Sequence, residues 1–228
     1  MSLTEFIVPT LNSMPRLSGT SSIRTMDICD VPSVVALHLE SFSGFFLSCL
    51  GPAFLRELYT ATLADPSGIG LVAENGKGIC GFVTGTSQPS GFYSRLLRLR
   101  WWRFGLAAVG PVLKRPLIIS RLFRAFSMPE QVTQEERRGT LMSIAVLPAH
   151  QGKGIGQALV REFIETATRR DLRKIDLTTD RTDNDATNRF YQNLGFTCQR
   201  TYTTPEGRVM NEYVIDVGAK ASSDNPCQ

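Results

Sequence analysis

The sequence predicts an α/β domain built on a mixed, mostly antiparallel central sheet that is flanked by helices. Three observations predict this fold class. One hairpin signal surrounds Asn75-Gly76, a second surrounds the PEG sequence near the C-terminus, and a β-α-β crossover lies between them. Hairpins pair strands antiparallel, whereas a crossover through a helix pairs them parallel. We therefore expect a sheet that contains both kinds of pairing.

The first half of the chain predicts two helices and a hairpin. A strand is expected over 22–27, where apolar and polar residues alternate, and a helix follows over 29–42 with Asp30 as its cap. A second helix, GPAFLRELYTATL, has a proline in its first turn and apolar residues at helical spacing. The next two β-rich runs flank Asn75-Gly76, whose residues both tolerate positive φ. These runs predict the first antiparallel hairpin.

The second half predicts the crossover and a closing hairpin. The strand GTLMSIAVLP is apolar nearly throughout, which is typical of a central strand. In the helix that follows, over 154–170, apolar residues recur at every fourth position, namely Ile155, Leu159, Phe163 and Ala167. A strand over RKIDLTTD comes next. A short helix then begins at a cap residue, Asn184 or Asp185, and stops at Gly195, before the two runs that flank PEG.

The composition is that of a globular domain. Of the 228 residues 42% are hydrophobic and 20% charged, and no apolar run approaches the roughly 20 residues that span a bilayer. No secretory signal opens the chain, so a cytoplasmic protein is expected. The predicted domain is 21–217, and the ends, 1–20 and 218–228, are expected to be flexible. Five separated cysteines and two histidines without partners at ligand spacing predict neither a disulfide framework nor a metal site.

Three glycines, Gly152, Gly154 and Gly156, lie between the central strand and the following helix. The first N–H groups of a helix have no intrahelical partner and carry the positive end of the macrodipole, and glycine lets an anion approach them closely. The run therefore predicts a phosphate-binding loop. It is not a Walker A loop, because the GxxxxGK[ST] spacing is absent. It is not GxGxxG, because Gln157 stands where the third glycine is expected.

Two motifs indicate which anion the loop binds. The sequence from Gln151 to Gly156 fits Q/R-x-x-G-x-G/A, and the sequence from Asn184 to Phe196 fits N-x-x-x-x-x-x-Y-x-x-L-G-F. Both motifs resemble motifs of the GNAT acyltransferase superfamily and follow each other in the order found there. The resemblance covers roughly residues 22–217, apart from an insertion. The resemblance implies a GNAT-like fold that binds acetyl-CoA, or a related acyl-CoA, as acyl donor. It also implies direct transfer to an amine, without a covalent enzyme intermediate.

The resemblance also assigns roles to residues. Backbone groups of the strand before the loop would hold the pantetheine arm and the acyl carbonyl. Asn184 would contact the cofactor arm and Tyr191 would protonate the coenzyme A sulfur; seven residues, nearly two helical turns, separate them, so both can face one ligand. The alternative for Tyr191 is an aromatic core residue. The expected cofactor-binding residues are Ile144, Ala145, Val146, Gln151, Gly152, Lys153, Gly154, Ile155, Gly156, Gln157, Asn184 and Tyr191.

The sequence does not identify the general base. Many members of the superfamily carry a carboxylate on the strand before the loop, but here that strand offers only Thr140 and Ser143. Glu40 and His38, at the end of the first predicted helix, are the candidate catalytic residues on the acceptor side. Two alternatives stay open: these side chains are solvated or locally paired, or the amine loses its proton through water.

A helical insertion, about 90–137, separates the third predicted main strand from the fourth. Two amphipathic helices are expected in it. Leu96, Leu99 and Trp102 follow helical spacing in the first, and Pro111 and a later proline separate it from the second, LIISRLFRAF.

The insertion is strongly basic. Between Arg95 and Phe126 lie eight bases and no acid, whereas the rest of the chain is net acidic. Three interpretations remain open: a lid whose arginines recognise an anionic acceptor, a peripheral contact of the 95–126 segment with an anionic membrane, or ordinary surface helices that could form a homodimer contact. Nucleic acid is not an expected partner, because no reading motif is present.

The expected activity is transfer of an acetyl group from acetyl-CoA to a primary amine of a small metabolite, such as an amino sugar or a polysaccharide precursor. The enzymatic alternative is a protein lysine or N-terminal acetyltransferase. The alternative from another class is a non-catalytic acyl-CoA-binding or sensing module, which the presence of Tyr191 disfavours.

Overall fold

A computed structural model of the chain describes residues 21–42, 46–114, 137–205 and 207–218. Within these residues lies a seven-stranded sheet in the order β1-β2-β3-β4-β5-β7-β6. Its strands are β1 (Ser22–Thr25), β2 (Gly68–Asn75), β3 (Gly78–Thr86), β4 (Arg138–Val146), β5 (Lys174–Asp180), β6 (Thr197–Thr203) and β7 (Val209–Asp216). The helices are α1 (Val31–Ser41), α2 (Phe46–Cys49), α3 (Gly51–Ala64), α4 (Phe92–Lys114), α6 (Ile155–Arg169) and α7 (Asp185–Asn193), with 3₁₀ turns η1 (Ile28–Asp30) and η2 (Pro148–His150).

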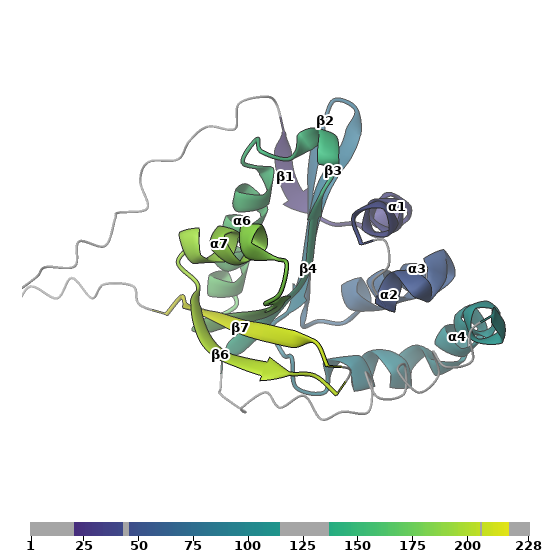
Figure 1. Cartoon of the computed structure of the whole chain (residues 1–228). Helices are drawn as coiled ribbons and strands as arrows, with labels where there is room; N and C mark the ends of the chain where they lie inside the picture. The colour runs from purple at the N-terminus through teal and green to yellow at the C-terminus, as the bar shows by residue number, and fades with distance from the viewer. Residues whose placement is uncertain (1–20, 43–45, 115–136, 206, 219–228) are drawn as a thin grey trace, which may run out of the picture.

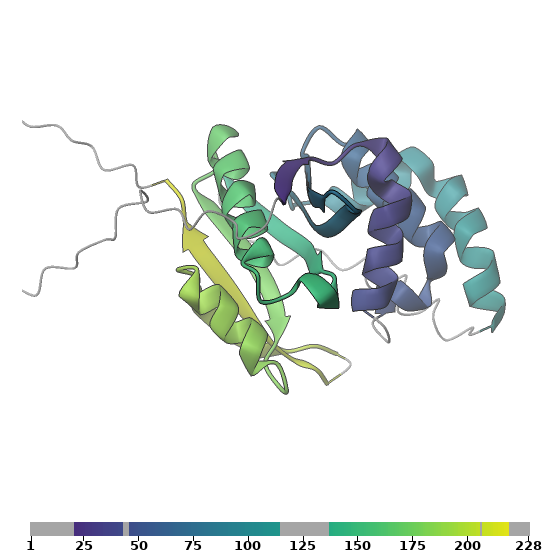
Figure 2. The same ribbon diagram turned by 90° about the horizontal axis from the view of Figure 1, so that it is seen from above.

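Helices cover both faces of the sheet. α1, α3 and α4 lie on one side, and α6 and α7 lie on the other, in both views of the ribbon (Figure 1 and Figure 2). Among the strands described, neighbours pair antiparallel except β4 and β5, which pair parallel. The mixed, mostly antiparallel sheet is therefore confirmed, and β4 is its central strand, as its apolar sequence predicts.

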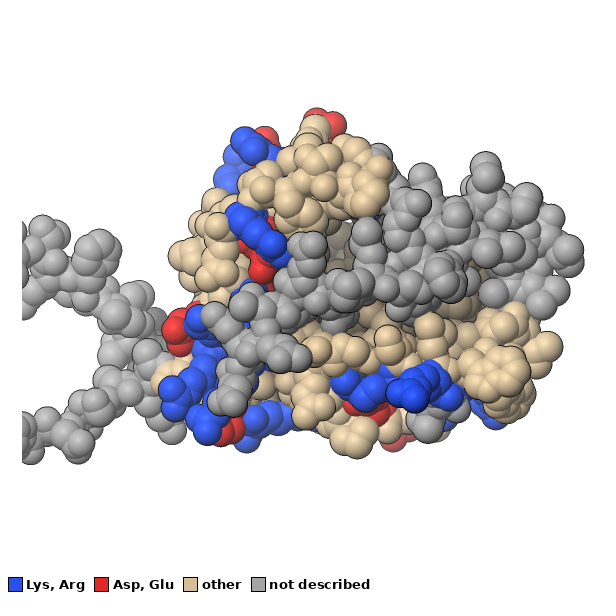
Figure 3. Space-filling model, turned by 90° about the horizontal axis from the view of Figure 1, so that it is seen from below, with Lys and Arg blue, Asp and Glu red and all other residues tan. Residues whose placement is uncertain are grey.

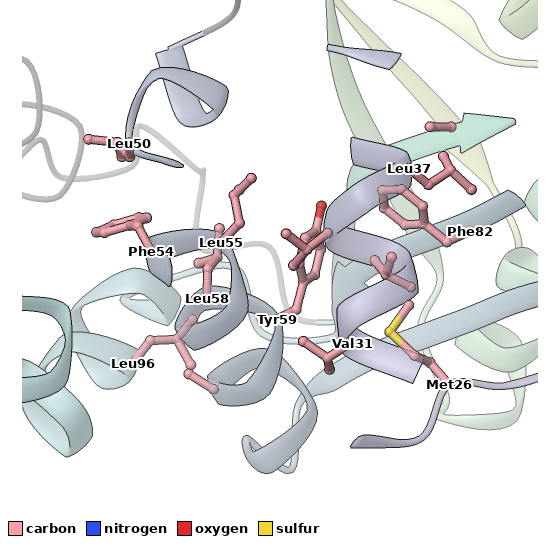
Figure 4. Packing of buried hydrophobic residues seen from close by; sticks show 14 of the residues in the cluster. Met26, Val31, Leu37, Leu50, Phe54, Leu55, Leu58, Tyr59, Phe82 and Leu96 are labelled. Carbon is pink, nitrogen blue, oxygen red and sulfur yellow. The ribbon is translucent and has the colours of Figure 1, made fainter. Parts of the chain in front are cut away.

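Each helical layer buries its own apolar cluster against the sheet. On the first side, Phe54, Leu55 and Leu58 of α3 pack with α1 and with Phe82 of β3 (Figure 4). On the second side, α6 is amphipathic, and its buried residues include Ile155, Leu159, Phe163 and Ala167. Because burying one large apolar side chain contributes roughly 1.5–3 kcal/mol, this stripe fixes α6 against β2, β3 and β4. The predicted period of four residues is confirmed.

The parallel strands β4 and β5 separate along their length. They pair only from Arg138 opposite Lys174 to Thr140 opposite Asp176, although β4 continues to Val146 and β5 to Asp180. On its other edge β4 stays paired with β3, with a bulge where Thr84 lies opposite Ser143 and Gly85 opposite Leu141. The β5-facing edge of β4 beyond Thr140 is therefore outside the strand ladder. Bulges and unpaired edges of this kind re-aim backbone groups beside active sites.

The first hairpin forms, but its turn differs from the predicted one. Asn75 pairs with Gly78, so Gly76 and Lys77 are the two turn residues. The residue with positive φ is Gly78 (119°), not Asn75 or Gly76. The reason is that the Asn75 side-chain oxygen accepts the Lys77 N–H at 2.8 Å, which closes the turn through a side chain.

Two predicted helix caps stand at the N-cap positions, but neither makes a side-chain capping hydrogen bond to its helix. Asp30 is the N-cap residue of α1 but does not cap that helix with its side chain, because Arg24 donates to both of its carboxylate oxygens at 2.6 and 2.9 Å and the Asp27 N–H donates to one of them at 2.7 Å. Asp27 instead caps η1 by accepting the Cys29 N–H at 3.0 Å. At α7, Asn184 is the N-cap residue but makes no side-chain capping bond, and Asp185 lies within the first turn.

The insertion begins with α4, which consists of two helical segments joined by a kink at Arg100, where φ and ψ are non-helical, and which continues past Pro111 to Lys114. The predicted shared face of Leu96 and Trp102 is wrong: Leu96 is 1% exposed and Trp102 is 50% exposed. Six residues of an ideal helix leave two side chains about 120° apart around the axis, and the break at Arg100 disturbs the phase further. The side chain that instead enters the core is that of Phe104.

Some predicted features lie outside the described residues. These are the second insertion helix over 117–126 and the flexible ends, 1–20 and most of 218–228. Where the structure does describe the chain, none of its helices has the length and hydropathy needed to span a bilayer.

Candidate functional site

The glycine loop connects the end of β4 to the first turn of α6. Gly152 and Gly154 both have left-handed backbone, with φ of 73° and 79°. Gly154 is the N-cap residue of α6, and no side chain caps the helix there. The first N–H groups of α6 therefore lack a side-chain partner and carry the positive end of the helix dipole. Residues 151–154 are all exposed, so an anion can reach these groups from solvent.

Side chains of the loop fasten it to the preceding segment. The Gln151 amide donates to the backbone oxygen of Val146 at 3.0 Å, and Lys153 Nζ donates to the backbone oxygen of Ala149 at 3.0 Å. His150 Nε2 lies 2.9 Å from the Asn75 amide nitrogen in the β2–β3 hairpin. These contacts hold the loop in place before any ligand arrives.

The other predicted loop residues divide between surface and core. Gln157 is exposed on α6, whereas the Ile155 side chain is 3% exposed and packs in the core, which leaves its N–H as the group that faces the loop. A Cβ on Gly156 would lie 3.5 Å from the Phe190 ring. This is an ordinary van der Waals distance, so packing against α7 does not by itself require a glycine at this position.

Beyond the divergence of β4 from β5, the edge of β4 supplies backbone groups next to the loop. Ile144, Ala145 and Val146 pair with Val83, Phe82 and Gly81 on the β3 side, and no strand among the described residues pairs with their opposite edge. Ala145 is buried, whereas Ile144 and Val146 are half-buried. A linear ligand can extend the sheet along this edge by taking the place that β5 leaves.

Asn184 and a second asparagine join α7 to the end of β5. The Asn184 amide donates to the backbone oxygen of Asp180 at 3.2 Å. Asn188, which is buried, accepts the Thr179 hydroxyl at 2.6 Å and donates to the backbone oxygens of Asp180 and Asn184 at 3.1 and 3.0 Å. Sequence reasoning missed Asn188, although its spacing of four from Asn184 signals a shared helix face.

Tyr191 lies in the aromatic core between α7 and the sheet. It is 4% exposed, and its ring centre lies 5.1 Å from that of Phe190 and 5.7 Å from that of Phe196. Burial raises the pKa of its hydroxyl well above the ordinary value of 10. The hydroxyl is therefore protonated at neutral pH, as a proton donor must be. Its core packing matches the alternative interpretation too.

The structure separates the two candidate bases. Glu40 is exposed, whereas His38 is 3% exposed and faces the sheet. His38 Nδ1 lies 2.6 Å from the Tyr59 hydroxyl, and its Nε2 has no hydrogen-bond partner among the described residues. Burial lowers the pKa of His38 to about 4, so the ring is neutral at pH 7.

A pocket of about 400 Å³ lies elsewhere. Its lining includes Met26, Leu63 and Gly70, with Thr166 and Arg170 at the C-terminal end of α6. Along the helix axis, Ile155 and Thr166 are eleven positions apart, which corresponds to roughly 16 Å. The pocket is therefore separate from the glycine loop at the opposite end of α6.

Comparisons with known proteins find related sequences and a similar fold. Two curated soybean (Glycine max) relatives match: probable acetyltransferase TAP2 is 29% identical over 110 residues, covering 42% of this chain and 43% of the relative, and histone acetyltransferase TAP1 is 27% identical over 113 residues, covering 43% and 47%. The chain thus matches less than half the length of these relatives. The structure of yncA from Salmonella typhimurium, solved with its cofactor acetyl-CoA, is similar with a TM-score of 0.56 at 16% identity, covering 91% of this chain and all of the other.

A family model matches a larger part of the chain than either soybean relative does. The model described as the acetyltransferase (GNAT) family matches residues 32–196, a range that contains β4, the glycine loop, α6 and α7. The chain therefore belongs to the acetyltransferase (GNAT) family.

Proposed function

We propose that this protein is an N-acetyltransferase that moves an acetyl group from acetyl-CoA to a primary amine of a small metabolite. The observation that carries the proposal is the glycine loop: left-handed Gly152 and Gly154 present the free N–H groups of α6 beside an edge of β4 without a partner strand. The diphosphate of coenzyme A binds those N–H groups. The pantetheine arm then runs along Ile144 to Val146, and the thioester reaches the bulge at Ser143.

The reaction needs little chemistry from side chains. The amine nitrogen attacks the thioester carbonyl carbon, a C–N bond forms and the C–S bond breaks, and the amine loses one proton while the departing thiolate gains one. Tyr191, whose hydroxyl stays protonated, donates to the sulfur and regains its proton from water. Asn184 contacts the cofactor arm. Backbone donors of β4 are fixed before the reaction, which is the most effective arrangement for a developing oxyanion.

Among the candidate bases, neither side chain is placed for direct proton abstraction. The Glu40 carboxylate is in solvent, and His38 Nδ1 is engaged with Tyr59. We therefore assign loss of the amine proton to water.

The acceptor is inferred to carry no phosphate that three of the four α4 arginines, Arg95, Arg100 and Arg103, would bind, whereas Arg98 is exposed. Arg95 donates to Asp65 and to the backbone oxygens of Ser90 and Gln88, and Arg100 and Arg103 pair with Glu57 at 3.5 and 3.6 Å. Guanidinium groups that already hold carboxylates and carbonyls are poor candidates for a lid over an anionic sugar nucleotide. This favours a small amine without a diphosphate over the nucleotide-linked sugar.

A protein acceptor is the second candidate. One soybean relative is named a histone acetyltransferase, which favours a lysine side chain or an N-terminus as the alternative amine. A non-catalytic acyl-CoA-binding module is the third candidate, and Tyr191 disfavours it. For each of these three candidate functions, the proposed location is the cytoplasm.

The outer face of α4 supports a peripheral membrane contact. Trp101, Trp102 and Leu106 are 71%, 50% and 69% exposed, and the Arg103 guanidinium lies 5.0 Å from the centre of the Trp102 ring. Figure 3 views the side of the molecule that carries α4, where basic side chains lie beside a broad uncharged surface. Tryptophan together with arginine suits an anionic membrane interface. A homodimer through this face is less favourable, because it would bring basic residues of two copies together.

The deciding experiment measures thiol release from acetyl-CoA with a panel of acceptors. The panel holds small primary amines, peptides with free N-termini, and N-terminally blocked peptides that contain lysine. Turnover with a small amine supports the proposal, and turnover with peptides alone supports the second candidate. Calorimetry with coenzyme A accompanies the screen: binding without any turnover indicates the non-catalytic module, and the absence of binding excludes all three.

A further inference from the structure

The segment that carries the glycine loop, 147–154, is fastened to the rest of the molecule at its two ends. At its start, the Leu147 N–H donates to the backbone oxygen of Cys80 in β3 at 2.9 Å, and just after its end the first residue of α6 is buried. Between these ends, the Gln151 and Lys153 side chains bond to backbone oxygens five and four residues earlier. Such bonds run back along the same stretch of chain, so they shape the segment without tying it to a distant element.

His150 ties the middle of this segment to a distant element. It is the last residue of η2, and its Nε2 lies 2.9 Å from the amide nitrogen of Asn75, which is 75 positions earlier in the chain. Asn75 is the last residue of β2, and in Figure 1 the turn between β2 and β3 and the loop before α6 both lie at the top of the view. Among the described residues, no other side chain of 148–154 bonds to a residue more than five positions away.

The orientation of the Asn75 amide fixes the proton of the His150 ring. The amide oxygen accepts the Lys77 N–H at 2.8 Å, so the amide nitrogen, which can only donate, is the atom that faces His150. His150 Nε2 therefore accepts, and the ring proton lies on Nδ1, because any other form of the ring would bring two donors together. That Nδ1 is buried and has no hydrogen-bond partner among the described residues. The orientation of the ring thus depends on its hydrogen bond with Asn75.

We propose that Asn75 and His150 are positioning residues for the diphosphate of acyl-CoA: they hold the glycine loop in the conformation that presents the α6 N–H groups. The inference rests on the proposed function and adds two residues to the same site, neither of which needs to touch the ligand. Glycine loses more conformational freedom on ordering than any other residue, so a loop with Gly152 and Gly154 would bind weakly if the ligand had to order it. A loop that is already held loses less freedom and binds the diphosphate more tightly.

Two replacements of His150 separate positioning from packing. His150→Leu keeps an apolar side chain and removes the bond, whereas His150→Gln keeps an acceptor oxygen that can take the place of Nε2. Calorimetry should show the Kd for coenzyme A rising about 3- to 10-fold in His150→Leu, the effect of one hydrogen bond, and staying closer to the parent value in His150→Gln. Pantetheine, which lacks the diphosphate, should bind all three proteins alike. Equal Kd values for coenzyme A in His150→Leu and the parent would overturn the proposal.

Asn75→Ala tests whether the two residues act together. This variant also loses the turn bond to Lys77, which should lower the free energy of unfolding equally in the parent and in His150→Leu. Its effect on the Kd for coenzyme A should appear in the parent and be absent in His150→Leu, where the contact is already broken. Glu74→Gln is the matched control, since that neighbouring side chain accepts from Arg24 of β1 at 2.9 Å and makes no bond to the loop. Additive losses of affinity in the double variant, or an equal loss in Glu74→Gln, would contradict the positioning roles.

The ring tautomer can be measured without any ligand. Long-range ¹⁵N–¹H correlation spectra of protein labelled with ¹⁵N-histidine distinguish Nδ1–H from Nε2–H, and His150→Gln identifies the His150 signals. The parent should show the Nδ1–H form, and Asn75→Ala should show a mixture of both forms, because the donor that selects one of them is gone. An Nε2–H form in the parent would overturn this inference and leave the proposed function intact. A parent that shows the Nδ1–H form but binds no coenzyme A would overturn the proposed function and this inference together.

Discussion

The side chains of Arg138 and Asp176 form a buried ion pair, with 2.5 Å between Nε and Oδ2, at the point where β4 and β5 part. They are 6% and 7% exposed. Thr140 donates to the other Asp176 oxygen at 2.5 Å, and Arg138 also reaches Glu212 of β7 at 2.7 Å. This cluster joins three strands just before the backbone edge assigned to the cofactor. The separation of β4 from β5 beyond Thr140 therefore depends on polar groups as well as on apolar packing.

We predict that Asp176→Asn destabilises the fold by about 3 kcal/mol, because the change leaves the buried Arg138 with one carboxylate fewer. Urea unfolding measures this change in the free energy of unfolding. The matched control is Asp171→Asn, whose pair with Arg137 is exposed and is expected to contribute less than about 1 kcal/mol. Replacing both partners, in Arg138→Met with Asp176→Leu, should cost less than the sum of the single changes. Equal losses in Asp176→Asn and Asp171→Asn would show that burial does not matter here.

A second prediction concerns the glycine loop. Gly154→Val places a β-branched residue at φ 79°, and such strain is of order 1–3 kcal/mol, so the loop should leave its present conformation. We expect the Kd for coenzyme A to rise by roughly 100-fold. Calorimetry measures it, with Gly105→Ala as the control, since that exposed glycine of α4 has open space and ordinary φ. Unchanged coenzyme A affinity in Gly154→Val would mean that the anion binds elsewhere.

The third prediction separates the two interpretations of Tyr191. Tyr191→Phe keeps the ring contacts with Phe190 and Phe196 and removes only the hydroxyl. If the hydroxyl donates to the departing sulfur, kcat falls roughly 100-fold while the Kd for acetyl-CoA and the free energy of unfolding change little. Steady-state kinetics and urea unfolding of the same preparation measure all three. A variant with the parent's kcat would make Tyr191 a core residue only.

The fourth prediction follows from the burial of His38. Its pKa is about 4 in the folded protein and near 6.5 when unfolded, so between these values the unfolded chain binds a proton that the folded chain does not. The free energy of unfolding therefore has its full value above about pH 6.5 and falls as the pH is lowered toward 4, by on the order of 3 kcal/mol in total. Tyr59 is the titratable group that contacts the ring, and Phe42 and Phe82 are its aromatic neighbours.

Urea unfolding of the parent and of His38→Asn at several pH values between 4 and 7 checks this prediction. The variant should lack the His38 contribution to the slope, and His150→Asn should retain it. Parallel curves for parent and His38→Asn would show that the imidazole titrates alike in both states.

The sequence predicted well those features that repeat locally. The spacing of Ile155, Leu159, Phe163 and Ala167 identified α6, because a period near 3.6 reports directly which face is buried. The glycine loop could also be found from the local sequence. Gly152 and Gly154 adopt left-handed backbone, and they lie in the chain directly between a strand and a helix. Family membership then followed from motifs that are short and contiguous.

The features that the sequence did not predict depend on contacts between distant segments. His38 and Tyr59 are 21 residues apart on different helices, and Arg138 and Asp176 are 38 apart, so no local pattern brings either pair together. Asp30 does hold the predicted N-cap position, but Arg24 of β1 pairs with its carboxylate, so the side chain makes no cap bond to α1. Local preference is overridden wherever a tertiary ion pair satisfies the same group.

The last prediction concerns the exposed face of α4. Trp101 and Trp102 lack apolar cover, so we expect the full chain to float with vesicles that contain phosphatidylserine and not with phosphatidylcholine vesicles. Replacing both tryptophans by serine should lower the bound fraction at limiting lipid by about tenfold or more, because two indole rings no longer enter the interface. Ile28→Ser is the matched control, since Ile28 is 52% exposed and belongs to η1, outside α4. Equal flotation of the double variant and the parent would assign the binding to the basic residues instead, and a parent that stays unbound would exclude the membrane contact.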